Sequence, residues 1–217
     1  MSEDTKNQWR ARLRADRRLM DDAASRLAAA GLATAGLGWA EQLGATHPQP
    51  ICAYVSTGQE PPTGLLLADL VRAGHRVFVP ICEPGHQLSW TPWTPGVAMA
   101  RSTLAPVMEP VGPRRAFAEL GAVAGVIVPA LAVDTAGVRL GQGGGYYDRF
   151  LAALRPAPAG RSEAGGEMGA AGAVPMAAVV YEREVVEPGR LPHDALDQPV
   201  DYIVTPGGFR AVRSWSA

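Results

Sequence analysis

Several features that would narrow the function are scarce in this sequence. The chain has two cysteines among its 217 residues, Cys52 and Cys82, and they are not spaced as a CxxC pair. Both lie in or beside apolar runs, where a reduced cysteine packs as a small hydrophobic residue. A disulfide framework is therefore not expected, and four scattered histidines give no zinc-ligand pattern.

Excess charge and long apolar runs are missing as well. The 20 basic and 21 acidic residues leave a formal net charge of −1, so no global field favours nucleic acid or an anionic membrane. No stretch approaches the roughly 20 apolar residues that span a bilayer, and the charged N-terminus is unlike a secretory signal. We therefore expect a reduced, cytoplasmic protein with neither nucleic acid nor membrane as a partner.

The sequence does contain the alternation of strand and helix segments that is typical of an α/β protein. Its content of 47% hydrophobic and 19% charged residues is ordinary for a globular domain. Apolar runs typical of buried strands alternate with helical segments, which predicts a mostly parallel sheet covered on both faces. Strands are expected at 51–55, 76–80, 125–129, 176–181 and 201–205, with an edge strand near 88–93, and helices at 63–73, 114–121 and 148–154.

The N-terminal segment is predicted to be helical. Apolar residues recur at helical spacing between residues 5 and 31, which indicates one helix that ends at Gly31. A shorter helix is expected near 34–43. The buried stripe of the long helix would consist of Trp9, Leu13, Met20, Ala24 and Leu27.

The same helix carries a basic ridge of Lys6, Arg10 and Arg14, spaced four residues apart. Such a ridge is more often a solvated charged face than a ligand site. The alternative is phosphate contact from a helix that packs near an anion-binding loop.

Residues 156–175 are low in complexity and rich in glycine and alanine. They contain too little apolar surface to order themselves, which predicts a flexible insertion. With this insertion included, we expect a single domain over residues 1–217.

The most informative segment is G-V-R-L-G-Q-G-G-G-Y-Y-D-R-F at 137–150. It follows a buried strand and opens a helix, and a loop stripped of side chains exposes backbone N–H groups to phosphate. It is neither a Walker A loop nor a G-x-G-x-x-G turn, so a structural turn is the alternative. Arg139 and Arg149 match phosphate oxygens, and the carboxylate of Asp148 can hold Mg²⁺.

Two further segments carry candidate ligand groups. Y-V-S-T-G-Q-E-P-P-T at 54–63 also lies between a strand and a helix, and Glu60 is placed to accept hydrogen bonds from a polar ligand. The alternative is that its hydroxyl residues only cap turns and a helix. Near the C-terminus, Asp194 is a candidate second metal ligand.

Taken together, these segments resemble the 5-formyltetrahydrofolate cyclo-ligase family, also called methenyltetrahydrofolate synthetases. The resemblance rests on K-x-x-x-R at 6–10, Y-V-S-T-G-Q-E at 54–60, V-P-A-L-A-V-D-T-A-G-V-R-L-G-Q-G-G-G-Y-Y-D-R at 128–149, and H-D with V-D-Y-I-V-T between 193 and 205. The long block is highly specific, and the others are weak alone. The resemblance implies one three-layer α/β domain with a mostly parallel sheet, of the NagB/RpiA/CoA-transferase-like class.

The resemblance also implies a set of site residues. ATP would be held by Lys6, Arg10, Arg139, Leu140, Gly141, Gln142, Gly143, Gly144, Gly145, Tyr146 and Tyr147. The folate would contact Val55, Glu60, Gln142, Gly143, Gly144, Gly145 and Tyr146, and Mg²⁺ would bind Asp148 and Asp194. Some members have a lysine where this chain has Gly144, so Arg139 and Arg149 are the expected catalytic side chains.

Members of this family convert 5-formyltetrahydrofolate and ATP to 5,10-methenyltetrahydrofolate, ADP and phosphate, with Mg²⁺. ATP phosphorylates the formyl oxygen, N10 attacks the formyl carbon, and phosphate leaves. Alignment and charge neutralisation are the protein's main tasks in such a transfer, so no nucleophilic side chain is needed. We expect a monomer acting on this small molecule.

Two other functions stay open at this point. A non-catalytic relative that binds nucleotide or folate is the main alternative, although Asp148, Arg139 and Glu60 are all present. A sugar-phosphate isomerase on a similar sheet is less favoured, because Glu60 is its only good candidate for the general base.

Overall fold

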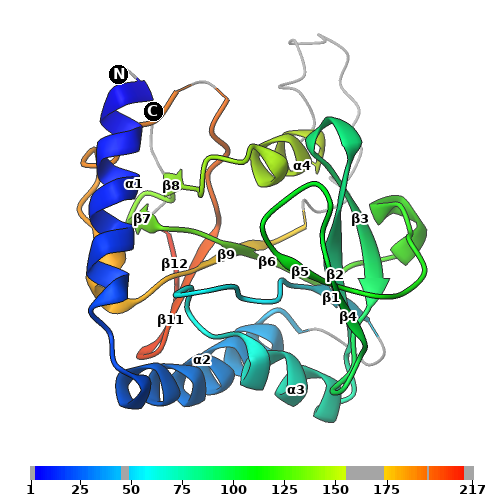
Figure 1. Ribbon diagram of the computed structural model, residues 1–217. Helices are drawn as coiled ribbons and strands as arrows, with labels where there is room; N and C mark the ends of the chain where they lie inside the picture. The colour runs from blue at the N-terminus through cyan, green and yellow to red at the C-terminus, as the bar shows by residue number, and fades with distance from the viewer. Residues whose placement is uncertain (1–2, 45–48, 155–173, 195, 213–217) are drawn as a thin grey trace, which may run out of the picture.

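The computed structural model describes residues 3–44, 49–154, 174–194 and 196–212. Its α-helices are α1 (Glu3–Arg18), α2 (Asp22–Gln42), α3 (Gly64–Arg72) and α4 (Tyr146–Leu154), and its 3₁₀ helices are η1 (Pro84–His86), η2 (Phe117–Leu120) and η3 (Glu182–Glu184). Figure 1 shows α2 and α3 along one face of a central sheet and α4 across the other, with α1 at one edge. The predicted insertion at 156–175 lies almost wholly outside the described residues.

The central sheet has seven strands, β1 (Pro50–Cys52), β2 (Arg76–Glu83), β3 (Gln87–Pro92), β6 (Gly125–Pro129), β9 (Met176–Val179), β11 (Tyr202–Thr205) and β12 (Gly208–Ala211). Their order is β12-β11-β9-β6-β1-β2-β3. The five inner strands are parallel, and the two edge strands pair antiparallel. The predicted α/β class, with a mostly parallel sheet between helices, is therefore confirmed.

Alternation along the strands explains why this sheet is covered on both faces. On β6, Ile127 joins the apolar cluster under α2 and α3, whereas Val126 and Val128 join the cluster under α4. On β9, Ala177 and Ala178 divide between the same two clusters. Because successive strand residues point to opposite faces, an uninterrupted apolar run fills both cores.

The N-terminal prediction was wrong about where the helices divide, because residues 5–31 do not form one helix and the segment 34–43 is part of α2, not a separate helix. α1 ends at Arg18, and Asp21 starts α2 by accepting a hydrogen bond from the Ala24 N–H at 2.7 Å. Asp is a preferred N-cap residue, so Asp21 marks the start of a new helix, but the apolar spacing continues across it and suggested a single helix. Leu27 is consequently exposed, and Gly31 lies inside α2 and does not end a helix.

Several short strands were not predicted. β4 (Met99–Arg101) and β5 (Met108–Pro110) form a hairpin in the proline-rich middle of the chain. β7 (Ala132–Asp134), β8 (Arg139–Leu140) and β10 (Val185–Val186) form a small second sheet against which α1 packs through Leu13. The predicted helix at 114–121 is only the 3₁₀ turn η2.

The topology places one crevice in the main sheet. β1 continues to β2 on one side, whereas its other neighbour is β6, which leads on to β9 and β11. The connections therefore leave the carboxyl ends of β1 and β6 in opposite directions, and such a switch point opens a ligand crevice. The two segments with predicted site residues, 54–63 and 137–150, follow these two strands.

No helix in the described part of the chain is long and apolar enough to span a membrane.

The packing of α2 gives a stability prediction. A Cβ added at Gly31 would overlap the backbone carbonyl oxygen of Pro206, whereas a Cβ at Gly64, the first residue of α3, would meet no heavy atom within 4 Å. We expect Gly31→Ala to lower the free energy of unfolding by about 1–3 kcal/mol, since such overlap forces the backbone to shift. Gly64→Ala, the matched control, should leave it unchanged or raise it by up to about 1 kcal/mol. Urea unfolding followed by circular dichroism measures both, and equal effects would contradict the packing of α2 on residue 206.

Candidate functional site

A pocket of about 810 Å³ lies at the switch point of the sheet. Its walls come from the segment after β1, the end of β2, the β4–β5 hairpin and the glycine loop, which we define as residues 141–145. This volume falls within the range that encloses small organic ligands. The crevice expected from topology is therefore present, and the two predicted segments share it.

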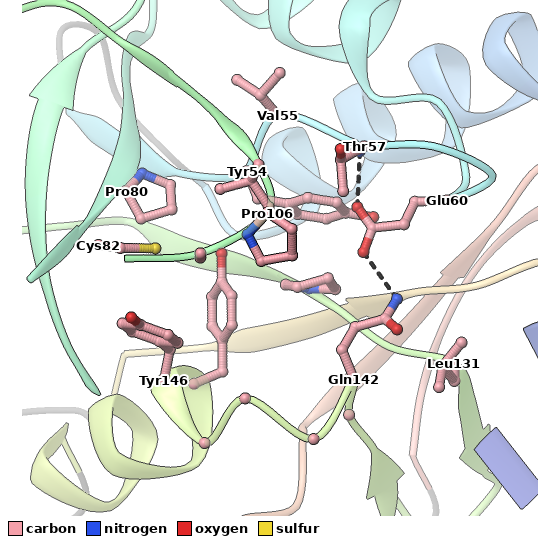
Figure 2. A pocket seen from close by; sticks show the side chains of 18 of the residues that line it. Tyr54, Val55, Thr57, Glu60, Pro80, Cys82, Pro106, Leu131, Gln142 and Tyr146 are labelled. Atoms are coloured by element: carbon pink, nitrogen blue, oxygen red, sulfur yellow. Dashed lines mark hydrogen bonds between the residues drawn. The ribbon is translucent and has the colours of Figure 1, made fainter. Parts of the chain in front are cut away.

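One end of the pocket has apolar walls. Figure 2 shows Pro80 and Cys82 on one side, Val55 at the top of the view, and Tyr146 reaching across from the start of α4. The Tyr146 ring packs edge-to-face on His86, with 5.2 Å between ring centroids. The neighbouring Tyr147 packs against both main cores and also lines the pocket. These walls suit the flat faces of a ring system.

Glu60 brings a carboxylate to the opposite side of the pocket (Figure 2). Its Oε2 accepts a hydrogen bond from the Thr57 N–H, and its Oε1 accepts one from Gln142 Nε2, each at 2.9 Å. Burial raises the pKa of Glu60 above its ordinary value, and the two hydrogen bonds partly oppose that shift. Each carboxylate oxygen retains capacity for another hydrogen bond, so this side suits a ligand with N–H donors.

The glycine loop is held against α1 by the basic ridge. The Gly141 carbonyl accepts a hydrogen bond from Arg10 Nε at 3.2 Å, and the Gln142 carbonyl accepts one from Arg14 Nη2 at 2.7 Å. In a planar trans peptide the N–H points opposite to the carbonyl, so the N–H groups of Gln142 and Gly143 point away from these arginines. Arg10 and Arg14 therefore lie on one side of the loop, and the loop presents these N–H groups on its other side.

Glycine is required in this loop for close approach as well as for conformation. A Cβ at Gly141 would come within 2.8 Å of Arg139 Nη1, and one at Gly143 within 3.3 Å of the Arg10 guanidinium carbon. Gly143 also has a φ of +95°, which other residues rarely adopt. The missing side chains thus let two arginines lie against the loop backbone.

Arg139 and Asp148 form an ion pair beside the loop. Arg139 is 3% exposed, its Nη1 donates to the Pro129 carbonyl at 3.2 Å, and its Nε has no hydrogen-bond partner within the described residues. A buried guanidinium N–H left without an acceptor is costly, so its presence beside a pocket points to an anionic ligand. Asp148 stands at the first turn of α4 and lines the same pocket.

Lys6 and Asp194, predicted to bind ATP and metal, contact each other. Lys6 Nζ lies 2.7 Å from Asp194 Oδ2 and 2.7 Å from Asp197 Oδ2. Burial alone would lower the pKa of Lys6, but the two aspartates outweigh it and raise that pKa, while Lys6 lowers the pKa of Asp194. No group of three or more potential metal ligands gathers among residues 3–44, 49–154, 174–194 and 196–212.

The other predicted residues divide between the pocket and its surroundings. Gly144 and Gly145 lie in the pocket wall, and Leu140 is buried in β8 beneath it. Arg149 is exposed, and its Nη1 donates to the Gly85 carbonyl at 2.9 Å, on the side of η1. Its predicted catalytic role stays a prediction.

Two parts of the site escaped sequence reasoning. Arg17, on the same helix as the ridge, forms a buried ion pair with Glu184 and lines the pocket. The hairpin segment 104–110 closes the pocket from the β5 side. Neither carries a local signal, since only the fold brings them to residues far away in the sequence.

Comparison with known proteins identifies the family. The family model described as "5-formyltetrahydrofolate cyclo-ligase family" matches residues 2–206. The chain belongs to this family. The resemblance seen in the motifs of the sequence is thereby confirmed, and with it membership in a group of ring-forming ligases.

Individual relatives agree with this assignment. A 5-formyltetrahydrofolate cyclo-ligase of Mycolicibacterium smegmatis is 35% identical over 156 residues, covering 70% of this chain and 77% of that protein. The solved 5,10-methenyltetrahydrofolate synthetase of Aquifex aeolicus has 25% identity and a TM-score of 0.70, with 98% and 95% of the two chains covered. The synthetase structure from Mycoplasma pneumoniae, 14% identical with a TM-score of 0.63 over 93% and 98% of the chains, shares the fold.

The surroundings of the two cysteines predict that their thiols react slowly with alkylating reagents. Burial, followed by the hydrogen bond and charge of Glu109, raises the pKa of Cys82 to about 12, and burial raises the pKa of Cys52 well above its ordinary value. Because only the thiolate reacts, alkylation of the native protein at pH 8 should be at least about 100-fold slower than in urea, and should accelerate up to pH 11. Iodoacetamide labelling followed by mass spectrometry measures the rates, with Cys82→Ser as the control. Rapid labelling of Cys82 at pH 8 would contradict the described environment.

Proposed function

We propose that this protein cyclises 5-formyltetrahydrofolate to 5,10-methenyltetrahydrofolate with conversion of ATP to ADP and phosphate. The observation that carries the proposal is a single pocket with two chemically different ends. One end has a glycine loop and arginines suited to phosphate, and the other has apolar walls and a buried carboxylate suited to a folate ring. Membership in the family supports the same reaction.

At the phosphate end, we assign ATP binding to the glycine loop and the cations around it. The loop N–H groups that point away from Arg10 and Arg14 would bind phosphate oxygens, as backbone donors at helix N-termini commonly do. Arg139, with an Nε that has no acceptor in the described residues, would place a fixed positive charge beside them. Lys6 supports this end by holding α1 to the segment at Asp194 and Asp197.

At the other end, we assign folate binding to Val55, Glu60, Gln142 and Tyr146. The ring of a folate has two flat apolar faces and several N–H donors at its edges. Val55 and Tyr146 would contact the faces, and Glu60 would accept from a ring N–H. The glycine loop borders both ends, so it would place the transferred phosphoryl group beside the formyl group.

The chemistry then follows from alignment. The formyl oxygen attacks the γ-phosphorus of ATP, the bond to the β-phosphate oxygen breaks, and ADP leaves. N10 of the folate next attacks the activated formyl carbon, the carbon–oxygen bond breaks, and phosphate leaves as N10 loses its proton. The protein contributes orientation, charge neutralisation and exclusion of water, which together account for most of the rate enhancement in phosphoryl transfer.

Mg²⁺ fits this site through Asp148. Magnesium usually binds one or two carboxylates together with substrate phosphates, so a cage of protein ligands is not needed. Asp148 lines the pocket at the start of α4, and it would neutralise phosphate charge together with the ion. Asp194 stays the predicted second ligand, and in the described residues its carboxylate contacts Lys6 and the Leu196 N–H.

The reaction is tested directly with purified protein. We expect the ultraviolet absorbance of 5,10-methenyltetrahydrofolate to grow when 5-formyltetrahydrofolate and Mg-ATP are mixed with the protein, and ADP to appear in equal amount. Omission of ATP is the control and should abolish the signal. If the protein binds both ligands but forms no product, the proposed reaction is refuted and the protein is a non-catalytic binding protein.

The metal assignment gives a second prediction. Asp148→Asn keeps an oxygen that can accept from Arg139 but removes the carboxylate charge, so the Mg²⁺ concentration for half-maximal rate should rise about 10-fold or more. Titrating Mg²⁺ at saturating ATP measures this. Asp69→Asn, on the distant helix α3, is the matched control and should not change it. The same titration with Asp194→Asn decides whether that residue is a ligand, and an unchanged Mg²⁺ requirement in Asp148→Asn would refute the assignment of Asp148.

A further inference from the structure

Glu109 is a buried carboxylate in the pocket with no role in the site as described so far. It lies on β5, is 9% exposed, and lines the pocket. Within the described residues it forms no ion pair with lysine, arginine or histidine. A buried charge without a cation costs free energy, so a structural role alone would favour a neutral residue here.

The position of Glu109 is fixed by β2. Its Oε1 accepts a hydrogen bond from the Cys82 N–H at 2.7 Å, which joins the β4–β5 hairpin to the end of the main sheet. Its charge also raises the pKa of both Cys82 and Tyr146, so the carboxylate is close to two side chains of the apolar wall. Oε1 therefore bonds the Cys82 N–H, and the Cys82 thiol is also within hydrogen-bond reach of the carboxylate, which retains further acceptor capacity among residues that line the pocket.

Glu109 and Glu60 occupy different sides of the pocket. Figure 2 shows Cys82 and Glu60 on opposite sides, and the hydrogen bond to the Cys82 backbone places Glu109 on the Cys82 side. Carboxylates accept hydrogen bonds and donate none. Two of them across an apolar slot therefore suit a flat ring that carries N–H donors on more than one edge, and a reduced pterin ring is such a ligand.

We propose that Glu109 is a substrate-binding residue that accepts a hydrogen bond from an N–H group of the folate ring, on the edge opposite the one bound by Glu60. This inference rests on the folate-binding function proposed above. It gives the β4–β5 hairpin a part in substrate recognition, since the hairpin supplies a ligand contact as well as a wall.

The substitution Glu109→Gln separates this role from a structural one. Glutamine keeps a side-chain oxygen that can accept from the Cys82 N–H, so the link between β5 and β2 persists while the charge is lost. A hydrogen bond to a charged acceptor contributes enough that its loss should weaken binding of 5-formyltetrahydrofolate about 10- to 100-fold. Binding of a non-hydrolysable ATP analogue should change less than about 2-fold, and the urea midpoint should stay near that of the wild type.

The measurement is isothermal titration of 5-formyltetrahydrofolate, without nucleotide, into the wild type, Glu109→Gln and Glu41→Gln. Glu41 is exposed on α2 and serves as the matched control, with an unchanged Kd expected. If the wild type and Glu109→Gln bind with the same Kd, Glu109 only links β5 to β2 and the inference is overturned while the proposed function stands. If Glu109→Gln weakens both ligands equally or lowers the urea midpoint, its role is structural, which also overturns the inference. If the wild type itself binds no 5-formyltetrahydrofolate, the proposed function fails and this inference fails with it.

Discussion

The Arg17 guanidinium carries its charge inside the protein at 2% exposure, and much of the site depends on how that charge is paired. Arg17 Nε and Nη2 donate to the two oxygens of Glu184 at 2.7 and 2.8 Å, and Nη2 also donates to the Ala130 carbonyl at 2.7 Å. An unpaired charge at this depth would cost several kcal/mol. The end of α1, the turn η3 and the residue after β6 must therefore stay together.

This attachment, with the Lys6 contacts near the start of α1, holds the helix at both ends. The residues between them are then positioned along the glycine loop, where Arg10 and Arg14 meet two of its carbonyls. An isolated loop of five residues with four glycines would lose much backbone entropy on ordering. Helix α1 compensates for that loss by fixing the loop before any ligand arrives, so less of the binding energy is spent on ordering the site.

The sequence predicted the parts of the molecule in which one local pattern decides the structure. The inner strands are apolar without interruption, and β6 begins and ends where 125–129 was expected. The break at Asp21 was missed because apolar spacing continues across it, and β4 and β5 were missed because prolines normally argue against strands. In the site, Glu60 and the glycine loop were both predicted to follow strands of the parallel sheet, which places them at the same edge of that sheet. The ion pair of Arg17 with Glu184, 167 residues apart, leaves no trace in either local segment.

Gln142 joins helix α1, through the glycine loop, to the ring side of the pocket. Its backbone carbonyl and its side-chain oxygen accept from Arg14 on the α1 side of the loop, while its side-chain nitrogen donates to Glu60 on the ring side. A ligand that displaces the loop therefore also moves a hydrogen-bond partner of Glu60. In the proposed reaction, the nucleotide and the folate must be held at a fixed separation for the formyl oxygen to reach the γ-phosphorus. Gln142 fixes the loop backbone, to which we assign the phosphates, relative to Glu60, to which we assign the ring, and this gives a reason for a long polar side chain among four glycines.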